Sequence, residues 1–488
     1  MPVSVSESGG AFCLSASSAI EVDLASPELM SIGNYLAAHL QPATGYSLNV
    51  ISDRGEPGVG NIRLSKGDVT AGQTLFEEGY ELSITGERII LSANQPAGLF
   101  RGVQTLRQLL PPLIEHQTIQ PGPWAIATGT IRDYPRFGYR GAMLDVARHF
   151  FPIEDLKRFV ELIAYYKINR FHVHLSDDQG WRIAIKSWPD LTAVGGSTQV
   201  GGSTGSLFYS QEQFADLVAY AAQRYIVVIP EIDMPAHTNA ALASYAGLNC
   251  NDIAPPLYTG TDVGFSSLCI GKESTNRFLN DVIGEIAQMT PGPYVHVGGD
   301  EARTTSAADY AQFIQSTQAT VLAAHKRMIG WAEVGRSTLA SSTVAQHWNP
   351  YDVGAVKNAV AQHVNVIMSP ANRCYLDMKY DASTSLGLSW AGFVDEQKAY
   401  SWDPATEIAG IVETDILGVE SPLWTETVIS RADVDTMTFP RLAGHAEIGW
   451  SKANDRSWDE YKVRIASHGP RLAAMGVAFY KSSRIPWL

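Results

Sequence analysis

Apolar runs short enough to be buried strands recur along the chain from residue 141 onward. Segments with helical spacing separate them, and the runs cover residues 141–145, 170–175, 226–231, 294–297, 328–331, 344–348, 364–368 and 417–420. Continuous apolar character is typical of parallel strands covered on both faces. Eight strands alternating with helices match a (β/α)8 barrel, which at about 350 residues would carry long loops.

Two helical patterns between these runs support the barrel. One predicted helix has an apolar face made by Leu156, Phe159, Val160 and Ile163. Ser210 and Gln213 form a capping-box pattern ahead of another helix. The alternative is a doubly wound open sheet, but no GxGxxG segment follows an early strand. We therefore predict an α/β protein with a (β/α)8 TIM barrel.

The first part of the chain has a different pattern. Short alternating segments predict strands over residues 19–23, 61–65, 80–84 and 88–92. Thr85-Gly86 between the last two indicates a hairpin. Helical spacing over 97–110 ends at Pro111-Pro112. We predict a small α+β domain over residues 1–135, followed by the barrel over residues 136–488.

The carboxyl ends of the predicted barrel strands are rich in acidic residues and tryptophans. They include Asp145 and Arg148, Asp177 and Asp178, Glu231, Asp233 and His237, Asp300 and Glu301, Trp331 and Glu333, Trp348, Tyr375 and Asp377, and Trp424 and Glu426. In a parallel barrel these ends meet at one rim, where active sites lie. Indole faces pack on the apolar faces of sugar rings, and charged groups bind hydroxyls. The rim therefore predicts a carbohydrate site.

The segment His296-Val297-Gly298-Gly299-Asp300-Glu301 is the most informative at this rim. Two glycines allow the backbone to approach another group closely. If strand alternation continued, the two carboxylates would point to different places. Such an arrangement suits two separate roles better than one shared metal, and we expect no metal. The alternative is a pair of N-terminal capping residues for the next helix.

The charge, hydropathy and cysteine content of the chain argue against several classes of binding partner. The net charge is −14 with no basic block, so we expect no nucleic-acid partner. No apolar run is long enough to span a bilayer, so we expect no membrane partner. None of the four cysteines forms a CxxC pair, which argues against a zinc or redox site.

Cys250 and Cys269 flank a loop-like stretch and predict a disulfide in an exported protein, with two ordinary thiols as the alternative. The first ten residues lack the features of a signal peptide. We expect a secreted protein whose signal has been removed, with a cytosolic location as the alternative.

Four segments resemble motifs of glycoside hydrolase family 20, the β-N-acetylhexosaminidases, and bacterial, streptomycete-like members in particular. They are RGAMLDVARHF, HLSDDQGWR, PEIDMPAH and HVGGDE, starting at Arg140, His174, Pro230 and His296. Residues 80–110 also resemble the small N-terminal domain of that family. The resemblance implies an exo-acting, retaining hydrolase without a cofactor. Its partner would be an oligosaccharide or glycoconjugate that ends in β-linked N-acetylglucosamine or N-acetylgalactosamine.

In this family the acetamido group of the substrate replaces an enzyme nucleophile and forms an oxazolinium ion. The resemblance implies that Glu301 is the general acid and base, and that Asp300 orients the acetamido N–H and stabilises the positive charge. Asp177 and His237 would support Glu301, and Tyr375 would bind the acetamido oxygen. The sugar-binding residues implied are Trp331, Trp348 and Trp424 around the acetamido group, Arg148, Asp377 and Glu426 on hydroxyls, and Trp390 at the leaving sugar.

A general acid needs a raised pKa, from burial or a nearby negative charge. We expect Asp300 to raise the pKa of Glu301 while staying ionised itself, and His172, His174 and His296 to belong to the core. Other functions are a disaccharide-releasing relative in the same family and a non-catalytic sugar-binding protein. A family 18 chitinase would carry DxxDxDxE, which the sequence lacks.

Overall fold

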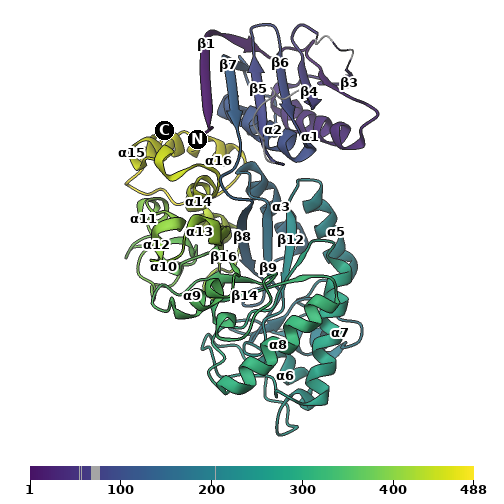
Figure 1. Ribbon diagram of the computed structural model, residues 1–488. Helices are drawn as coiled ribbons and strands as arrows, with labels where there is room; N and C mark the ends of the chain where they lie inside the picture. The colour runs from purple at the N-terminus through teal and green to yellow at the C-terminus, as the bar shows by residue number, and fades with distance from the viewer. Residues whose placement is uncertain (54, 56–57, 68–76, 204) are drawn as a thin grey trace. The chain divides into compact units, whose positions relative to one another are not determined.

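The computed structural model describes residues 1–53, 55, 58–67, 77–203 and 205–488. The chain forms two compact units (Figure 1). One contains Met1–Arg136, Ala164–Lys167 and Ala446–Leu488, and the other contains Phe137–Ile163 and Ile168–His445. The division predicted at residue 135 stays a prediction, and the unit that holds the N-terminus also takes in the last segment of the chain.

The second unit contains a closed parallel barrel, which confirms the predicted fold class. Its strands are β8 (Tyr139–Asp145), β9 (Arg170–His174), β12 (Val227–Glu231), β13 (Tyr294–His296), β14 (Arg327–Trp331), β15 (Val344–His347), β16 (Asn365–Met368) and β17 (Ile416–Leu423). Each lies on one of the eight predicted runs. Pairing of β17 with β8, from Gly418 opposite Tyr139 to Leu423 opposite Leu144, closes the ring.

Helices surround this barrel as the alternating pattern predicts (Figure 1). The main ones are α3 (Ile153–Tyr165), α5 (Gln211–Ala222), α7 (Glu273–Met289), α8 (Ala307–Ala323), α9 (Gly354–Ala361), α13 (Arg431–Thr438) and α14 (Arg441–Trp450). Short helices in the loops are α4 (Asp190–Ala193), α6 (Asn239–Ser244), α10 (Ala371–Cys374), α11 (Glu396–Tyr400) and α12 (Pro404–Glu407). Ser210 and Gln213 form the predicted capping box at the start of α5.

Inside the barrel an apolar layer lies below a polar one. The apolar layer consists of Tyr139, Ile229, Tyr294, Ile329, Val344 and Ile367, all buried. The polar layer includes His172, Glu231, His296, Gln346 and Glu420, each of which is 0% exposed. Because buried polar groups need partners to offset lost hydration, these side chains bind one another, as Gln346 Nε2 does by donating to Glu420 at 2.8 Å.

The first unit contains a seven-stranded sheet in the order β1-β7-β5-β6-β4-β2-β3. Its strands are β1 (Ser4–Cys13), β2 (Ile20–Val22), β3 (Val50–Ser52), β4 (Ile62–Lys66), β5 (Tyr80–Ile84), β6 (Ile89–Ala93) and β7 (Ala125–Asp133). The four predicted strands, the antiparallel β5–β6 hairpin and helix α2 (Pro96–Leu109) are confirmed. Helix α1 (Pro27–Thr44) and strands β1, β3 and β7 were not predicted.

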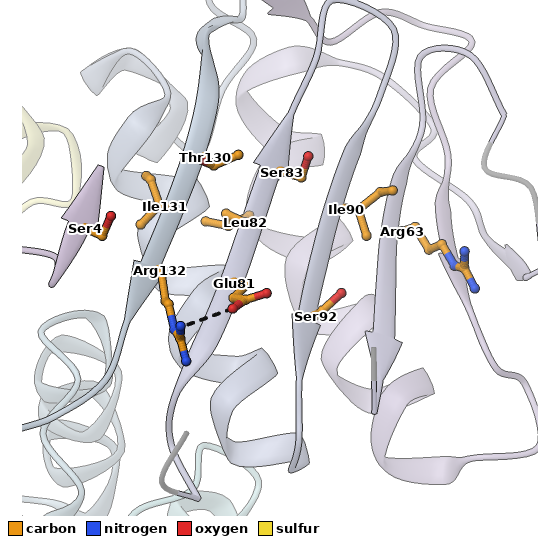
Figure 2. Close-up of a pocket in the computed structure, with 10 residues that line it drawn as sticks. All are labelled: Ser4, Arg63, Glu81, Leu82, Ser83, Ile90, Ser92, Thr130, Ile131 and Arg132. Carbon is orange, nitrogen blue, oxygen red and sulfur yellow. Dashed lines mark ion pairs between the residues drawn. The ribbon is translucent and has the colours of Figure 1, made fainter. Parts of the chain in front are cut away.

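Figure 2 shows one face of this sheet with the side chains that line it. A hollow of about 530 Å³ lies on it, lined by residues that include Ser83, Ser92 and Thr130. Glu81 and Arg132 form an ion pair across β5 and β7 at 3.5 Å. The polar side chains alternate with buried ones such as Leu82 and Leu91, as expected for a sheet covered on one face only.

The end of the chain is tied to the first unit by several hydrogen bonds. Trp450 Nε1 donates to Asp133 at 2.8 Å. The Arg471 guanidinium, in α16 (Gly469–Ala474), donates to the carbonyl oxygens of Arg107, Gln108 and Leu110 at the end of α2. Segments from both ends of the sequence therefore complete one unit.

The predicted disulfide between Cys250 and Cys269 is present, while Cys13 and Cys374 are free thiols. It closes the loop between α6 and α7, where residues 251–268 lie mostly outside regular structure. Among the described residues, no helix is both long and apolar enough to cross a bilayer.

Replacing both Cys250 and Cys269 with serine should lower the free energy of unfolding by about 3 kcal/mol, because the cross-link restricts the unfolded chain over 19 residues of separation. Urea unfolding of the double variant beside the Cys13→Ser variant would test this. Equal midpoints for both variants and the unchanged protein would show that the cross-link contributes nothing.

Candidate active site

The two glycines after β13 do accommodate a close approach, and the group that approaches is Asp233. Gly298 has φ +68°, and a Cβ there would lie 1.6 Å from Asp233 Oδ1. Gly299 has φ +99°, and its N–H donates to that same oxygen at 3.1 Å. The glycines therefore allow a buried carboxylate from the β12 end to pack under the segment that carries Asp300 and Glu301.

Asp300 and Glu301 lie beyond the strand, which ends at His296. Strand alternation therefore does not set the directions of these two side chains. Each carboxylate has one oxygen near His237 Nε2, at 3.5 Å from Asp300 and 3.6 Å from Glu301. Asp300 is buried, whereas the Glu301 side chain is 18% exposed and its backbone has φ +46°. Helix α8 begins only at Ala307, so neither residue caps it.

Asp177 and His237 form the pair that the sequence predicts behind Glu301. His237 Nδ1 lies 3.1 Å from Asp177 Oδ1, and the other Asp177 oxygen binds His174 Nε2 at 2.8 Å. Arg148 also binds Asp177, at 2.9 Å. Arg148, His237 and His174 outweigh the effect of burial on Asp177, so its pKa lies well below the usual value. In turn, although burial opposes it, Asp177 and Asp300 hold the pKa of His237 well above its usual value.

The pKa values of the carboxylate pair are the reverse of those expected. Burial, together with the charge of Glu301, raises the pKa of Asp300 to about 6, even though His237 opposes this shift. Burial also acts to raise the pKa of Glu301, but His237 and Arg303 outweigh it and leave this pKa lowered. Arg303 Nη2 lies 2.6 Å from Glu301 Oε1. Sequence reasoning did not foresee this cation two positions after the acid.

The predicted hydroxyl-binding residues gather on one side of the site. Arg148 Nη1 lies 3.1 Å from Asp145 and 4.0 Å from Glu426. Asp377 is 2% exposed, and no described residue donates a hydrogen bond to either of its carboxylate oxygens. Burial and the charge of Glu426 raise the pKa of Asp377 well above its usual value. A buried acid without donors is suited to a ligand hydroxyl.

The predicted aromatic residues also lie together. The ring centroids are 5.7 Å apart for Trp331 and Trp424, 6.1 Å for Tyr375 and Trp424, and 6.4 Å for Trp348 and Tyr375. Trp390 packs at 5.9 Å from Trp348 and is 46% exposed, so it stands at the outer edge. The result is an apolar box with one exposed tryptophan at its rim.

Glu231 organises the floor of the site, a role that the sequence did not reveal. One of its carboxylate oxygens accepts a hydrogen bond from Trp331 Nε1 at 2.9 Å, and His174 Nδ1 lies 2.6 Å from the other. His172 Nε2 lies 2.9 Å from Glu231 Oε2, and His296 Nδ1 lies 2.9 Å from Glu231 Oε1. These three histidines are buried in the core, as expected. The sequence feature that could have indicated this role is the position of Glu231, an acidic residue at the end of an otherwise apolar strand.

Asp233, His237 and Asp300 offer possible cation-ligand atoms within 4.8 Å of one another. Asp177, Asp300 and Asp233, however, outweigh burial and raise the pKa of His237, which favours the protonated ring. A protonated ring has no lone pair for a metal. The cluster therefore fits a network of charged hydrogen bonds better than an ion site.

A parallel barrel whose rim combines a carboxylate pair, a box of tryptophans and a hydroxyl-binding corner defines the class of barrel glycosidases. Comparison with known proteins gives the family. Residues 137–453 match the catalytic domain of glycosyl hydrolase family 20, and residues 1–134 match domain 2 of that family. The chain belongs to glycosyl hydrolase family 20.

Individual relatives are similar over almost the whole chain. A β-N-acetylhexosaminidase of Cellulomonas fimi is 40% identical over 98% of this chain and 94% of its own length. The family 20 β-N-acetylhexosaminidase of Streptomyces coelicolor A3(2) has a TM-score of 0.96 at 47% identity, covering 100% of this chain and 98% of its own. The Streptomyces plicatus enzyme, solved with Thio-NAglucal, has a TM-score of 0.96 at 49% identity, with 100% and 97% covered.

Gly298→Ala should destabilise the protein and remove most activity. A left-handed backbone costs an alanine about 1–2 kcal/mol, and the clash with Asp233 adds to this. Thermal unfolding and activity should be compared with Gly284→Ala in α7, where a Cβ meets nothing within 4 Å. If both variants unfolded at the same temperature, the close approach of Asp233 would not be a real constraint.

Proposed function

We propose that this chain is an exo-acting β-N-acetylhexosaminidase that removes terminal N-acetylglucosamine or N-acetylgalactosamine with retention of configuration. The observation that carries this proposal is the apolar box of Trp331, Trp348, Trp424 and Tyr375 beside Asp300. Such a box suits an acetamido group, which has a methyl to bury and an N–H and a carbonyl oxygen to bind. Burial raises the pKa of Tyr375 well above its usual value, and the charges of Asp377 and Asp300 add to this, so Asp300 lies near the tyrosine.

In the first step the acetamido carbonyl oxygen attacks C1, and the bond from C1 to the leaving oxygen breaks. Asp300 accepts a hydrogen bond from the acetamido N–H and stabilises the positive charge of the resulting oxazolinium ion. With a pKa of about 6, Asp300 is largely ionised at pH 7 before that charge develops. The Tyr375 hydroxyl donates to the acetamido oxygen and holds it below C1.

Glu301 gives its proton to the leaving oxygen in the first step. In the second step it takes a proton from water as that water attacks C1 and reopens the oxazolinium ring. Its protonation on the free protein is opposed by His237 and Arg303. His237, fixed by Asp177, keeps the carboxyl group in place through both steps.

The proposed cleavage of the terminal sugar of an oligosaccharide rests on three residues, Arg148, Asp377 and Glu426. They form a corner of charged groups suited to the hydroxyls of a terminal sugar, and Asp377, at 2% exposure, lies at its buried end. This arrangement favours release of single sugars over release of disaccharides.

Chitin-derived oligosaccharides are the substrates we propose, since each ends in β-linked N-acetylglucosamine. Secretion is part of the same proposal and is supported by the disulfide, because such bonds persist in oxidising compartments. Release of N-acetylglucosamine from chitobiose, and activity in the medium of the source cells, would test these two points.

Glu301→Gln should lose roughly 10²–10⁴-fold in kcat/KM on chitobiose, because general acid catalysis supplies about that factor. On the 2,4-dinitrophenyl glycoside the loss should be much smaller, since this leaving group needs no proton. Glu273→Gln, an exposed glutamate at the start of α7, is the matched control. Equal losses on both substrates would exclude Glu301 as the acid.

Substrate assistance predicts that a trifluoroacetamido substrate reacts far more slowly, because its carbonyl oxygen is a weaker nucleophile. A thiazoline analogue of the oxazolinium ion should bind much more tightly than substrate, as mimics of transition-state-like species do. Kinetics with both compounds, and NMR of the initial product for its β configuration, make the test. Trapping of a covalent sugar on Asp300 or Glu301 would contradict it.

A further inference from the structure

A pocket that shares Trp348 with the apolar box opens beside Glu301. It has a volume of about 370 Å³, and its walls include the carboxylates Glu301 and Glu333 and the guanidinium groups of Arg303 and Arg336. This volume lies within the range of small-ligand sites. If Glu301 protonates the leaving oxygen, as the proposed function requires, the leaving group must occupy space next to Glu301. The chemistry of this wall then bears on which leaving groups bind.

Arg303 is the residue of this wall that touches the acid. Its guanidinium lies 2.6 Å from Glu301 Oε1, and its backbone N–H donates to the Glu301 carbonyl oxygen at 2.6 Å. The Arg303 side chain is 61% exposed. Its other hydrogen bond is a long one, 3.5 Å, to the Val263 carbonyl oxygen. A guanidinium has five N–H donors, so several remain for a ligand in the pocket.

The pairing of Arg303 with Glu301 conflicts with the role of Glu301. A carboxylate held by a guanidinium is ionised, whereas the acid must carry a proton when the leaving group departs. Arg303 must therefore release Glu301 before or during the first step. A negative group on the leaving sugar would supply a new partner for the guanidinium at the place where it is needed.

The loop closed by Cys250 and Cys269 keeps Arg303 at the mouth of this pocket. The Arg303 side chain crosses Gly264, where an added Cβ would lie 2.7 Å from its Cδ. Ser267 Oγ and Thr305 Oγ1 are 2.6 Å apart, which links the loop to the turn after Glu301. The aliphatic part of the Arg303 side chain is therefore supported, while its guanidinium contacts Glu301.

We propose that Arg303 is a specificity-determining residue that favours leaving groups bearing a carboxylate. Arg336 adds a second cation to the same wall and is only loosely held, since its partner Asp352 is 46% exposed. The chain carries a net charge of −14, so an anionic substrate is attracted only by such local cations. Guanidinium and carboxylate pair through two parallel hydrogen bonds, which gives both affinity and orientation.

The same arrangement predicts a pH effect. Glu301 is faced by Arg303, His237, Arg148 and Asp300. The cations favour the carboxylate, so removal of Arg303 raises the pKa of Glu301. The reaction requires protonated Glu301, so kcat/KM falls at high pH as this proton is lost. In Arg303→Gln this fall in kcat/KM should occur at higher pH. A purely structural role for Arg303 would leave the pH of this fall unchanged.

Two matched substrates test the proposal: the β-N-acetylglucosaminides of 3-hydroxybenzoate and 3-hydroxybenzamide. They differ mainly in the charge of the leaving group. We expect the unchanged protein to favour the benzoate in kcat/KM by about 2- to 5-fold, as a solvent-exposed ion pair implies. Arg303→Gln should remove this preference, and Arg303→Lys should retain part of it.

Lys357→Gln, an exposed residue in α9, controls for the loss of one positive charge and should keep the full preference. Equal rates on both substrates in the unchanged protein, or a preference that survives in Arg303→Gln, would overturn the role of Arg303 and leave the hexosaminidase assignment standing. Failure to cleave either glycoside would instead refute the proposed function, and this inference with it.

Discussion

The site depends on a single buried carboxylate, that of Glu231 at the end of β12. It lies within 2.9 Å of a ring nitrogen of Trp331, His172, His174 and His296. A carboxylate without water is stable only when charged or polar donors surround it. Burial acts against its ionisation, but the surrounding histidines outweigh this and hold the pKa of Glu231 well below its usual value. The barrel core can contain an anion because the rings complete its shell.

This arrangement couples two parts of the site that are distant in sequence. On one side Glu231 fixes the indole of Trp331, a wall of the apolar box. On the other it binds His174, which binds Asp177, which binds His237 beside Glu301. One hydrogen-bond network therefore contacts both the histidine beside the acid and a wall of the acetamido pocket.

The sequence was sufficient for the barrel, because buried strands have a strong pattern, and the polar ends of those strands named the residues that the structure places together at the rim. It was insufficient where neighbours come from elsewhere in the fold. The lowered pKa of Glu301 depends on Arg303 and His237 reaching it in space, which two adjacent acidic residues in a motif cannot reveal. Strand β1 escaped prediction because its residues are almost all exposed and have no apolar alternation.

The contacts of Trp450 and Arg471 with the first unit affect the order in which that unit can be completed during synthesis. Arg471 and Trp450 bind the end of α2 and β7 in the first unit, although that sheet emerges from the ribosome long before them. Domains synthesised first usually fold first. Here the first sheet obtains these hydrogen bonds only after the intervening barrel has been synthesised. Until then Asp133 and the carbonyl groups at the end of α2 lack these partners, so this part of the unit is completed last.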